Sequence, residues 1–424
     1  MAITTEKIAQ YTGILKSELK VAMGCTEPIA IAYCAAYARK VLGRKPERYE
    51  VFCSGNIIKN VKAVTVPKTG GMKGIEAAVL AGALGGDPDA ELEVLTNLTD
   101  RDREEIREEL KKDIVKVSLL ESSHVLHIIV YVFAGEEEVS VEIIDSHTKI
   151  GKIARNGEVI QDGGKPQGAC CGADVTDLNI LDILEYADKV DLEEVRDTLE
   201  RQIDYNSAIS DEGLRNVYGA GIGPLLEKNA GRNIQEHAKA AAAAGSDARM
   251  NGCALPVVIN SGSGNQGITV SLPIIVYARE MGKSREELMR ALCVGNLVAI
   301  HQKAGIGALS AFCGATCAAV GSVAGIAYMQ YADYETISLM VTNALATVSG
   351  MVCDGAKSSC AGKIATALES AFIGYEAAKL RRGYRSGEGI VKRDVERTID
   401  SVARMAARGM HSTDIEILNI MLEK

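Results

Sequence analysis

The sequence predicts an α+β protein, in which an N-terminal domain of helices and a mostly antiparallel sheet precedes an all-α C-terminal domain. Strand signals alternate with helix signals between residues 49 and 159. Beyond Asp177 one helical pattern follows another, and almost no strand pattern remains up to Lys424. The stretch 160–176 is rich in turn-forming residues and reads as a linker. We therefore predict domains at 1–170 and 171–424, with no internal repeat.

The chain begins with two predicted helices. Apolar residues recur at helical spacing from Ile8 to Ala22, and Gly24 ends this pattern. Thr26 is predicted to cap the second helix, with Pro28 in its first turn. This helix, at 29–41, is nearly all apolar. We therefore expect it to be buried.

Strands are expected wherever short β-prone runs follow the first two helices. The predicted strands are 49–55, 62–66, 92–96, 114–120, 124–135, 139–145 and 149–159. Two helices interrupt them, at 73–84 and at 100–112. The second is densely charged, so we expect it to face solvent.

Composition limits the classes of function. The 424 residues carry a net charge of −9, which argues against nucleic acid as a partner because phosphate binding needs a basic surface. Aromatic residues make up 4% and Trp is absent, whereas Gly numbers 42. Such a chain packs through close backbone approach. We expect a homo-oligomer, as a dimer, that acts on a small molecule.

The 11 cysteines do not resemble a disulfide framework, since their number is odd and their spacing irregular. The N-terminal residues are charged throughout and contain no apolar signal-peptide core. The expected location is the reducing cytoplasm. The thiols are then core residues, nucleophiles or metal ligands.

Two long uncharged segments, 250–278 and 304–332, raise the alternative of a membrane transport protein. The first contains the polar run S-G-S-G-N-Q-G, whose backbone would be costly to bury in lipid. The second is rich in Ala, Gly, Ser and Cys, and so only weakly membrane-seeking. We therefore expect buried helices of a protein without membrane contact.

Three cysteines near the C-terminus are candidate metal ligands. Cys353 and Cys360 flank a turn-forming run, and Cys313 lies in a Gly/Ala-rich segment 40 residues upstream. Three thiols do not complete a structural zinc site, which uses four ligands. They do suit an iron–sulfur cluster that leaves one iron open. The alternative is that they are small buried core residues.

Cys25 lies in the motif M-G-C-T-E-P, between a predicted helix end and the next helix start. A helix N-terminus favours the thiolate form, so Cys25 is a candidate general base or a fourth ligand. The alternative is that Cys25 packs in a tight turn and that Glu27 is only a first-turn charge.

The run N-S-G-S-G-N-Q-G at 260–267 precedes a helical pattern and is a candidate anion site. It lacks the features of a P-loop or a dinucleotide motif, and an ordinary Gly-rich loop is the alternative. Its candidate substrate-binding side chains are Ser261, Ser263, Asn265 and Gln266. Further candidates for a carboxylate site are Asn56, Lys59 and Lys303, and His147 is a candidate acid or base.

Four motifs together resemble the L-cysteine desulfidase family, which is related to the α-chain of bacterial iron–sulfur L-serine dehydratases. They are M-G-C-T-E-P (23–28), I-N-S-G-S-G-N-Q-G (259–267), F-C-G-A-T-C (312–317) and V-C-D-G-A-K-S-S-C-A-G-K (352–363). The resemblance covers essentially the whole chain. It implies a [4Fe–4S] cluster held by Cys313, Cys353 and Cys360, although Cys317 lies close enough in sequence to compete with Cys313.

The resemblance also implies the reaction, a β-elimination from an amino acid. L-cysteine would give pyruvate, ammonia and hydrogen sulfide, and L-serine would give pyruvate and ammonia. The choice of cysteine depends on the resemblance alone. Alternatives from another class are small-molecule membrane transport and a cluster-containing sensor without turnover.

Overall fold

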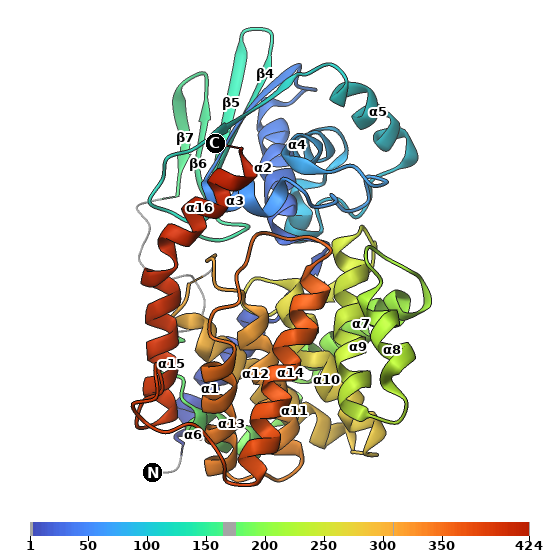
Figure 1. Cartoon of the computed structure of the whole chain (residues 1–424). Coiled ribbons are helices and arrows are strands. Elements are labelled where there is room, and N and C mark those ends of the chain that lie inside the picture. The colour runs from blue at the N-terminus through green and yellow to red at the C-terminus, as the bar shows by residue number, and fades with distance from the viewer. Residues whose placement is uncertain (1–2, 164–174, 308, 424) are drawn as a thin grey trace.

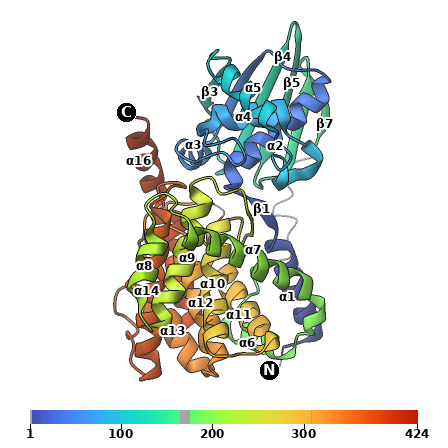
Figure 2. The same cartoon turned by 90° about the vertical axis from the view of Figure 1, so that its right-hand side faces the viewer.

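The computed structural model describes residues 3–163, 175–307 and 309–423. A sheet with its helices lies above a larger assembly of helices, and both views show this arrangement (Figures 1 and 2). The predicted α+β class is confirmed. Most of the predicted linker, 164–174, lies outside the described residues.

The sheet has six strands in the order β3-β2-β4-β5-β6-β7. The β2–β3 pair is parallel and the other neighbouring pairs are antiparallel. The predicted strand at 149–159 is a hairpin of two strands. The strands are β2 (Arg48–Cys53), β3 (Val115–Leu119), β4 (His127–Ala134), β5 (Glu137–Ile144), β6 (Ile150–Arg155) and β7 (Glu158–Asp162).

Two predicted strands are absent from this sheet. Residues 62–66 form an irregular hairpin with 72–74, in which Val66 N–H donates to the Met72 carbonyl. Residues 92–96 form the end of the 3₁₀ helix η1 (Pro88–Glu93) and the turn after it, because Asp87 caps that helix and Pro88 fixes its first turn. The alternating apolar residues Leu92 and Val94 are buried there without joining a ladder. Burial and strand pairing give the same alternating pattern, so the pattern alone misled the prediction.

The predicted apolar helix is α2 (Thr26–Leu42), and it packs on the inner face of β4 and β5 and against another helix, α4 (Gly74–Gly85). A Cβ on Gly82 would lie 2.0 Å from the Ala32 carbonyl oxygen, so only glycine permits this crossing. The predicted N-cap is off by one residue, because Cys25 and not Thr26 precedes the first helical residue. The remaining helices beside the sheet are α3 (Gly55–Val61) and α5 (Asp100–Leu110).

The first predicted helix is shorter than its apolar pattern suggested. Helix α1 (Thr5–Glu18) ends before the strand β1 (Val21–Met23), which pairs antiparallel with β8 (Pro256–Val258). This two-stranded ribbon carries the chain from β1 directly to Cys25, and from β8 to the loop at 260–267. It therefore brings together two motifs that lie more than 200 residues apart in the sequence.

The helical assembly contains the two uncharged segments, which form β8, the following loop and α10, and then a loop and α12. Gly321 of α12 packs so closely on α11 that an added Cβ would lie 2.4 Å from the Gly295 carbonyl oxygen. Within the described residues, no helix has both the length and the apolar character needed to cross a bilayer. The helices that follow the sheet and build the helical assembly are α6 (Ile180–Lys189), η2 (Leu192–Glu194), α7 (Arg196–Arg215), α8 (Ile222–Ala230), α9 (Ile234–Met250), α10 (Gly264–Glu280), α11 (Arg285–Ala304), α12 (Ala315–Met329), α13 (Tyr334–Thr347), α14 (Cys360–Lys379) and α15 (Val395–Arg404).

The two terminal helices lie in different parts of the molecule (Figures 1 and 2): α1 lies within the helical assembly, whereas α16 reaches the sheet part. Helix α1 packs against α6 and α11, and Lys7 forms a 2.7 Å ion pair with Asp182. After a π-helical turn, η3 (Met405–Gly409), helix α16 (His411–Met421) packs against α3. Buried Lys59 of α3 pairs with Asp414 of α16. The C-terminal helix thus fastens the sheet part to the helical part.

Candidate active site

A cavity of about 110 Å³ lies where the start of α2, the 260–267 loop and the cysteine segments meet. The sequence-predicted residues that line it are Cys25, Ser263, Asn265, Gln266, Lys303, Cys313, Cys353 and Cys360. It is also lined by four polar residues that were not predicted, Glu27, Asn60, Arg249 and Ser310. Motifs from four distant parts of the chain therefore share one small space.

Two predicted substrate-binding residues do not line this cavity. Ser261 has a left-handed backbone (φ 48°), and its hydroxyl donates to the Asn260 side chain at 2.9 Å. Asn56 lies in the first turn of α3, outside the lining. Cys317, the competitor of Cys313, is fully buried in α12 and also lies outside the lining.

Local backbone pairing places Cys313 beside Cys353. Phe312 and Val352 form an antiparallel bridge, in which Cys313 N–H donates to the Met351 carbonyl at 2.9 Å and Cys353 N–H to the Ala311 carbonyl at 2.6 Å. Gly355 then turns the chain with φ 94°, and a Cβ there would lie 2.3 Å from the Lys59 carbonyl oxygen. This turn returns the chain to Cys360, the first residue of α14.

The three thiols affect one another's ionisation. A hydrogen bond from the Cys313 thiol lowers the pKa of Cys353 although burial opposes this, and the same contact raises the pKa of Cys313. Burial raises the pKa of Cys360. Within the described residues, these three are the only cysteines that are partly exposed. They differ in this respect from the buried cysteines of the core.

Lysine ammonium groups surround this thiol end of the cavity, which we define by Cys313, Cys353 and Cys360. Lys59 donates to the Cys353 carbonyl at 3.4 Å, and Lys363 donates to the Val352 carbonyl at 2.7 Å. Lys303 is buried and donates to the Gly307 carbonyl. Burial lowers the pKa of Lys303, while the negative charge of the neighbouring thiolates acts in the opposite direction. These cations favour negative charge on the thiols.

At the other end of the cavity, the Cys25 thiol donates to Glu27 Oε2 at 3.1 Å. Burial raises the pKa of Cys25 far above its ordinary value, and the charge of Glu27 raises it further. The sequence-based expectation of a thiolate at this helix N-terminus is therefore wrong, because burial beside a carboxylate outweighs the helix dipole. Burial and the Glu27 carboxylate together favour the thiol form of Cys25.

Glu27 was interpreted from the sequence only as a possible first-turn charge, but it is a buried member of the cavity. Its Oε1 accepts from the Asn60 amide at 2.9 Å, and its Oε2 accepts from the Thr26 hydroxyl at 3.1 Å. The Cys25–Glu27 pair, with Asn60 and Thr26, forms the carboxylate end of the cavity. A carboxylate on a helix that is otherwise apolar and buried was the sequence signal for this role.

Electrostatics keep Glu27 ionised. Burial alone would raise the pKa of its carboxyl. A positive charge on His147 when that ring is protonated, the hydrogen bond from the Cys25 thiol, the Glu27 amide and the Arg249 charge act against burial and lower the pKa. Burial also lowers the pKa of His147, so this ring is neutral near pH 7. The hydrogen bonds therefore maintain the carboxylate at that pH.

The 260–267 loop is fixed by buried amides beneath it. Asn260 Nδ2 donates to Asn296 Oδ1 at 2.9 Å, and Asn296 Nδ2 donates to Gln202 at 2.8 Å. Gly267 meets β8 so closely that a Cβ would lie 2.0 Å from the Val258 carbonyl oxygen. The loop thus presents the N-terminus of α10 to the cavity, where backbone N–H groups favour anions.

Arg249, in the last turn of α9, contributes a guanidinium that was not predicted from the sequence; it directly precedes the uncharged segment 250–278. Its Nη1 donates to Asn265 Oδ1 at 3.1 Å. Its charge reaches the carboxylate end, where it lowers the pKa values of both Cys25 and Glu27. The cavity therefore has a cation at each end.

The donor set at the thiol end fits a cluster better than a single ion. Across the described ranges, no group of three or more His, Cys, Asp or Glu side chains is arranged to hold one metal ion. In an iron–sulfur cluster each cysteine binds its own iron, so the sulfurs need not converge on one point. The three partly exposed thiols, with lysines beside them, can therefore serve as ligands of a cluster without converging on one point.

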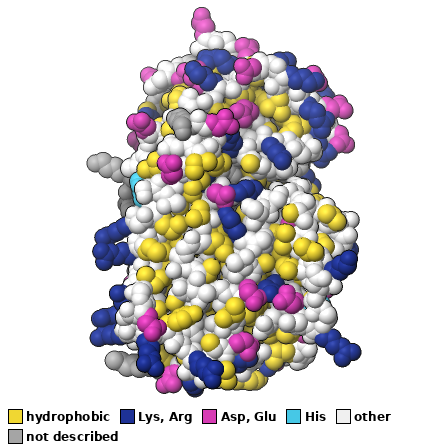
Figure 3. All heavy atoms as spheres, viewed as in Figure 1, with side chains coloured by type: hydrophobic (Ala, Val, Ile, Leu, Met, Phe, Trp, Pro, Cys, Tyr) yellow, Lys and Arg dark blue, Asp and Glu magenta, His cyan; other side chains and the backbone are white. Residues whose placement is uncertain are grey.

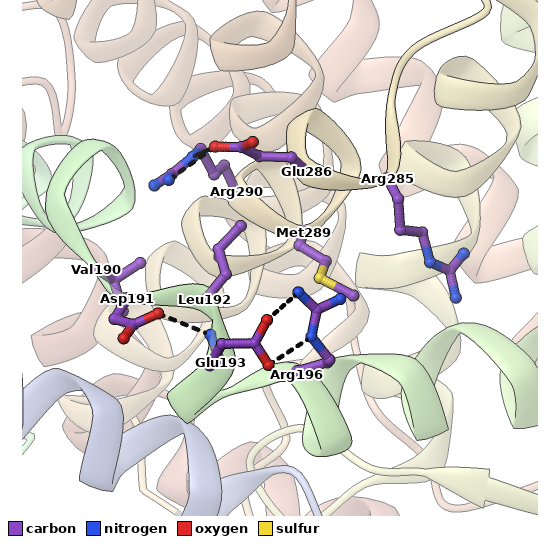
Figure 4. Close-up of a pocket in the computed structure, with 9 residues that line it drawn as sticks. All are labelled: Val190, Asp191, Leu192, Glu193, Arg196, Arg285, Glu286, Met289 and Arg290. Carbon is purple, nitrogen blue, oxygen red and sulfur yellow. Dashed lines mark hydrogen bonds and ion pairs between the residues drawn. The ribbon is translucent and has the colours of Figure 1, made fainter.

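A second hollow of about 410 Å³ lies between η2 and α11, and Figure 4 shows the residues that line it. It contains none of the sequence-predicted residues. Its arginines are neutralised by glutamates: Arg196 pairs with Glu193, and Arg290 pairs with Glu286 at 2.9 Å. Arg285 pairs with Glu200. The hollow therefore carries no comparable chemistry.

Comparison with known proteins gives the family. A UPF0597 protein of Finegoldia magna is 51% identical over 415 residues, which cover 98% of this chain and 99% of the relative. A UPF0597 protein of Desulfitobacterium hafniense is 49% identical over 415 residues, covering 98% and 96%. A UPF0597 protein of Treponema denticola is 45% identical and covers both chains completely.

A family model described as "Serine dehydratase alpha chain" matches residues 89–419. This stretch contains Arg249, Lys303 and the three cysteines of the thiol end, whereas Cys25 and Glu27 precede it. The predicted relation to serine dehydratase α-chains is confirmed. The chain belongs to the serine dehydratase alpha chain family.

Proposed function

We propose that the protein is a lyase that catalyses β-elimination from L-cysteine, giving pyruvate, ammonia and hydrogen sulfide. One observation carries the proposal: in a chain of the serine dehydratase alpha chain family, three partly exposed cysteines and a buried thiol–carboxylate pair line the same cavity. Cys313, Cys353 and Cys360 would hold a [4Fe–4S] cluster. When bound, such a cluster supplies Lewis acidity that stabilises a thiolate or hydroxide leaving group.

The carboxylate end would move the substrate's Cα proton. As the Cα–H bond breaks, Cys25 sulfur takes that proton while its own thiol proton passes along the 3.1 Å hydrogen bond to Glu27 Oε2. The electron pair left at Cα forms the Cα=Cβ bond, and the Cβ–S bond breaks. The released aminoacrylate becomes an imine, which water hydrolyses to pyruvate and ammonia.

Other side chains of the cavity would orient the substrate and balance charge. The first-turn N–H groups of α10, with Ser263 and Asn265, favour a carboxylate. Lys303 would compensate the negative charge of the thiolates. In this mechanism Cys25 acts as a proton carrier. If Cys25 were instead a fourth ligand of the cluster, it could not pass the proton from Cα to Glu27.

L-serine is the second candidate substrate, and the description of the family model favours it. The two eliminations differ only in the leaving atom, and the same cavity suits both. A cluster-containing sensor would bind the substrate without consuming it.

The experiment is anaerobic purification followed by a visible spectrum, iron analysis, and parallel assays of sulfide and pyruvate from L-cysteine and L-serine. We expect iron-dependent colour and equal amounts of sulfide and pyruvate from L-cysteine. An active preparation without iron would remove the cluster from the proposal. Pyruvate from L-serine alone would make the protein a serine dehydratase, and a coloured protein without turnover would favour the sensor.

A cytoplasmic homodimer is the assembly that we propose. Helix α14 exposes Ile373, and Leu380 directly after it is also exposed; apolar side chains spread across the middle of the face shown in Figure 3. Size-exclusion chromatography with light scattering tests the dimer, and a monomeric mass would contradict it.

A further inference from the structure

Arg249 is a buried cation without a carboxylate partner. Its relative exposure is 4%, and within the described part of the chain no Asp or Glu oxygen lies within 4.0 Å of its guanidinium nitrogens. Its Nε is inaccessible and has no hydrogen-bond partner there. Buried charges are normally paired, because desolvating an unpaired ion is costly. Among the described residues, Arg249 therefore has no direct ion pair, although the more distant Glu27 carboxylate feels its charge.

The absence of a side chain at Gly264 leaves space for this guanidinium. A Cβ on Gly264 would lie 2.3 Å from Arg249 Nε and 2.6 Å from its Cζ. Glycine at the first position of α10 thus lets the guanidinium lie against that helix N-terminus. Two independent features that attract an anion, the buried cation and the helix amides, meet at one wall of the cavity.

The other cations near the cavity already have partners. Lys59 pairs with Asp414, and Lys363 pairs with Asp354. Lys303 faces the thiol end, where the charge of Cys313 and Cys353 acts on it. Arg249 faces the carboxylate end, where it has no direct ion pair among the described residues.

An unsatisfied acceptor lies in the same cavity. Asn60 Nδ2 must face Glu27, because a carboxylate only accepts, so Asn60 Oδ1 points elsewhere and is buried without a partner among the described residues. Gln266 Oε1 is a second buried acceptor without a partner. Unpaired buried polar atoms are rare in proteins. The Arg249 guanidinium and the two unpaired acceptors match the carboxylate and ammonium groups of a small zwitterion.

We propose that Arg249 binds the α-carboxylate of an amino-acid substrate, and that Asn60 and Gln266 accept hydrogen bonds from its α-ammonium group. The assignment rests on the proposed β-elimination for its substrate class. The planar guanidinium can bind a carboxylate through two parallel hydrogen bonds, which a lysine cannot do. Arg249 would therefore select α-amino acids over amines and amides of the same size.

The test uses L-alanine, which has no β leaving group, so that binding is measured without turnover. Calorimetry on the anaerobically purified holoprotein compares L-alanine with L-alaninamide, which lacks the carboxylate, and with propionate, which lacks the ammonium group. We expect wild type to prefer L-alanine over L-alaninamide by at least about tenfold. Arg249→Gln should reduce this preference to within about twofold while keeping the preference over propionate, and Arg249→Lys should give an intermediate value.

The matched control is Arg290→Gln on α11, which removes a guanidinium from the other hollow (Figure 4). It should leave both preferences unchanged. If neither Arg249 variant folds, Gly264→Ala decides, since its methyl group displaces the guanidinium and should weaken L-alanine binding but not L-alaninamide binding. The assignment is overturned if Arg249→Gln keeps the wild-type preference for L-alanine over L-alaninamide. Where no Arg249 variant folds, the same result in Gly264→Ala overturns it.

Turnover assays on the same preparations separate this inference from the proposed reaction. If wild type converts neither L-cysteine nor L-serine, but Arg249→Gln loses carboxylate preference, the binding assignment stands and the reaction does not. If Arg249→Gln keeps both the carboxylate preference and the wild-type KM for a substrate that turns over, the reaction stands and the assignment fails.

Discussion

The two ends of the cavity use cysteine in different ways. At the thiol end, Cys313, Cys353 and Cys360 are partly exposed and lie beside lysines. At the carboxylate end, Cys25 is buried and donates to Glu27. Ammonium groups favour thiolates, which bind metals, whereas a carboxylate keeps a thiol protonated and available for proton transfer. On the roles proposed above, the neighbouring charge, and not the residue type, separates a metal ligand from a proton carrier.

The largest effect is expected from Cys360→Ala. Losing one of the three proposed cluster ligands should lower activity by at least about 100-fold and remove most of the bound iron. Iron and acid-labile sulfide analysis with an activity assay measures both. The control is Cys317→Ala, which removes a fully buried thiol outside the cavity and should keep its iron. If Cys360→Ala kept the wild-type iron content and Cys317→Ala lost iron, Cys317 and not Cys360 would be the ligand.

Glu27→Gln tests the carboxylate end. Gln cannot take the Cys25 proton, so kcat should fall by about 10²- to 10⁴-fold while iron content stays constant. Steady-state kinetics and the visible spectrum measure the two quantities. Glu76→Gln, at a first-turn glutamate of α4 outside the cavity, is the matched control. Loss of iron in Glu27→Gln would contradict the separation of the two ends.

Lys303→Met tests charge compensation at the thiol end. Removing this buried cation should reduce the affinity for iron by about tenfold, because the thiolates lose a neighbouring positive charge. Chelator competition followed by visible absorbance measures the change. Lys379→Met, an exposed lysine on α14 that pairs with Glu376, should behave as wild type. Equal chelator resistance in both variants would show that Lys303 does not support the thiol end.

The smallest effect concerns pH and His147. Its pKa is held below the ordinary value of 6.5, so below that pH the unfolded chain binds more protons than the folded chain. Stability should therefore fall as pH drops from 7.5 to 5.5, with at most about 1.4 kcal/mol per pH unit from this group. The window stays above 4.5, the ordinary pKa of the Glu carboxyl, where Glu27 begins to contribute in the same direction.

Urea unfolding at several pH values checks this, and His147→Gln should flatten the dependence. His124→Gln, at a partly exposed histidine paired with Asp145, is the control and should retain the wild-type slope. An unchanged slope in His147→Gln would assign the acid sensitivity to other groups.

Where the sequence-based prediction and the structure differ, the difference has a physical reason, as two elements show. The apolar residues at 92–96 gave a strand pattern, yet Asp87 and Pro88 start a 3₁₀ helix and the buried side chains follow it. The helical pattern around Leu19 continued past the true end of α1, because strand β1 pairs with a segment more than 200 residues away. Local patterns could not reveal a partner at that distance.

The sequence by itself determined the α+β class, the buried character of α2, and the family relation carried by four motifs. These follow from periodicity and short-range chemistry, which adjacent residues encode. Only the tertiary structure decided that Cys25 is a thiol, that Glu27 is its acceptor, and that Arg249 lies unpaired beside Gly264. Desolvation and charge at a buried site depend on every element that surrounds it, and the β1–β8 ribbon that assembles this site joins residues from opposite halves of the chain.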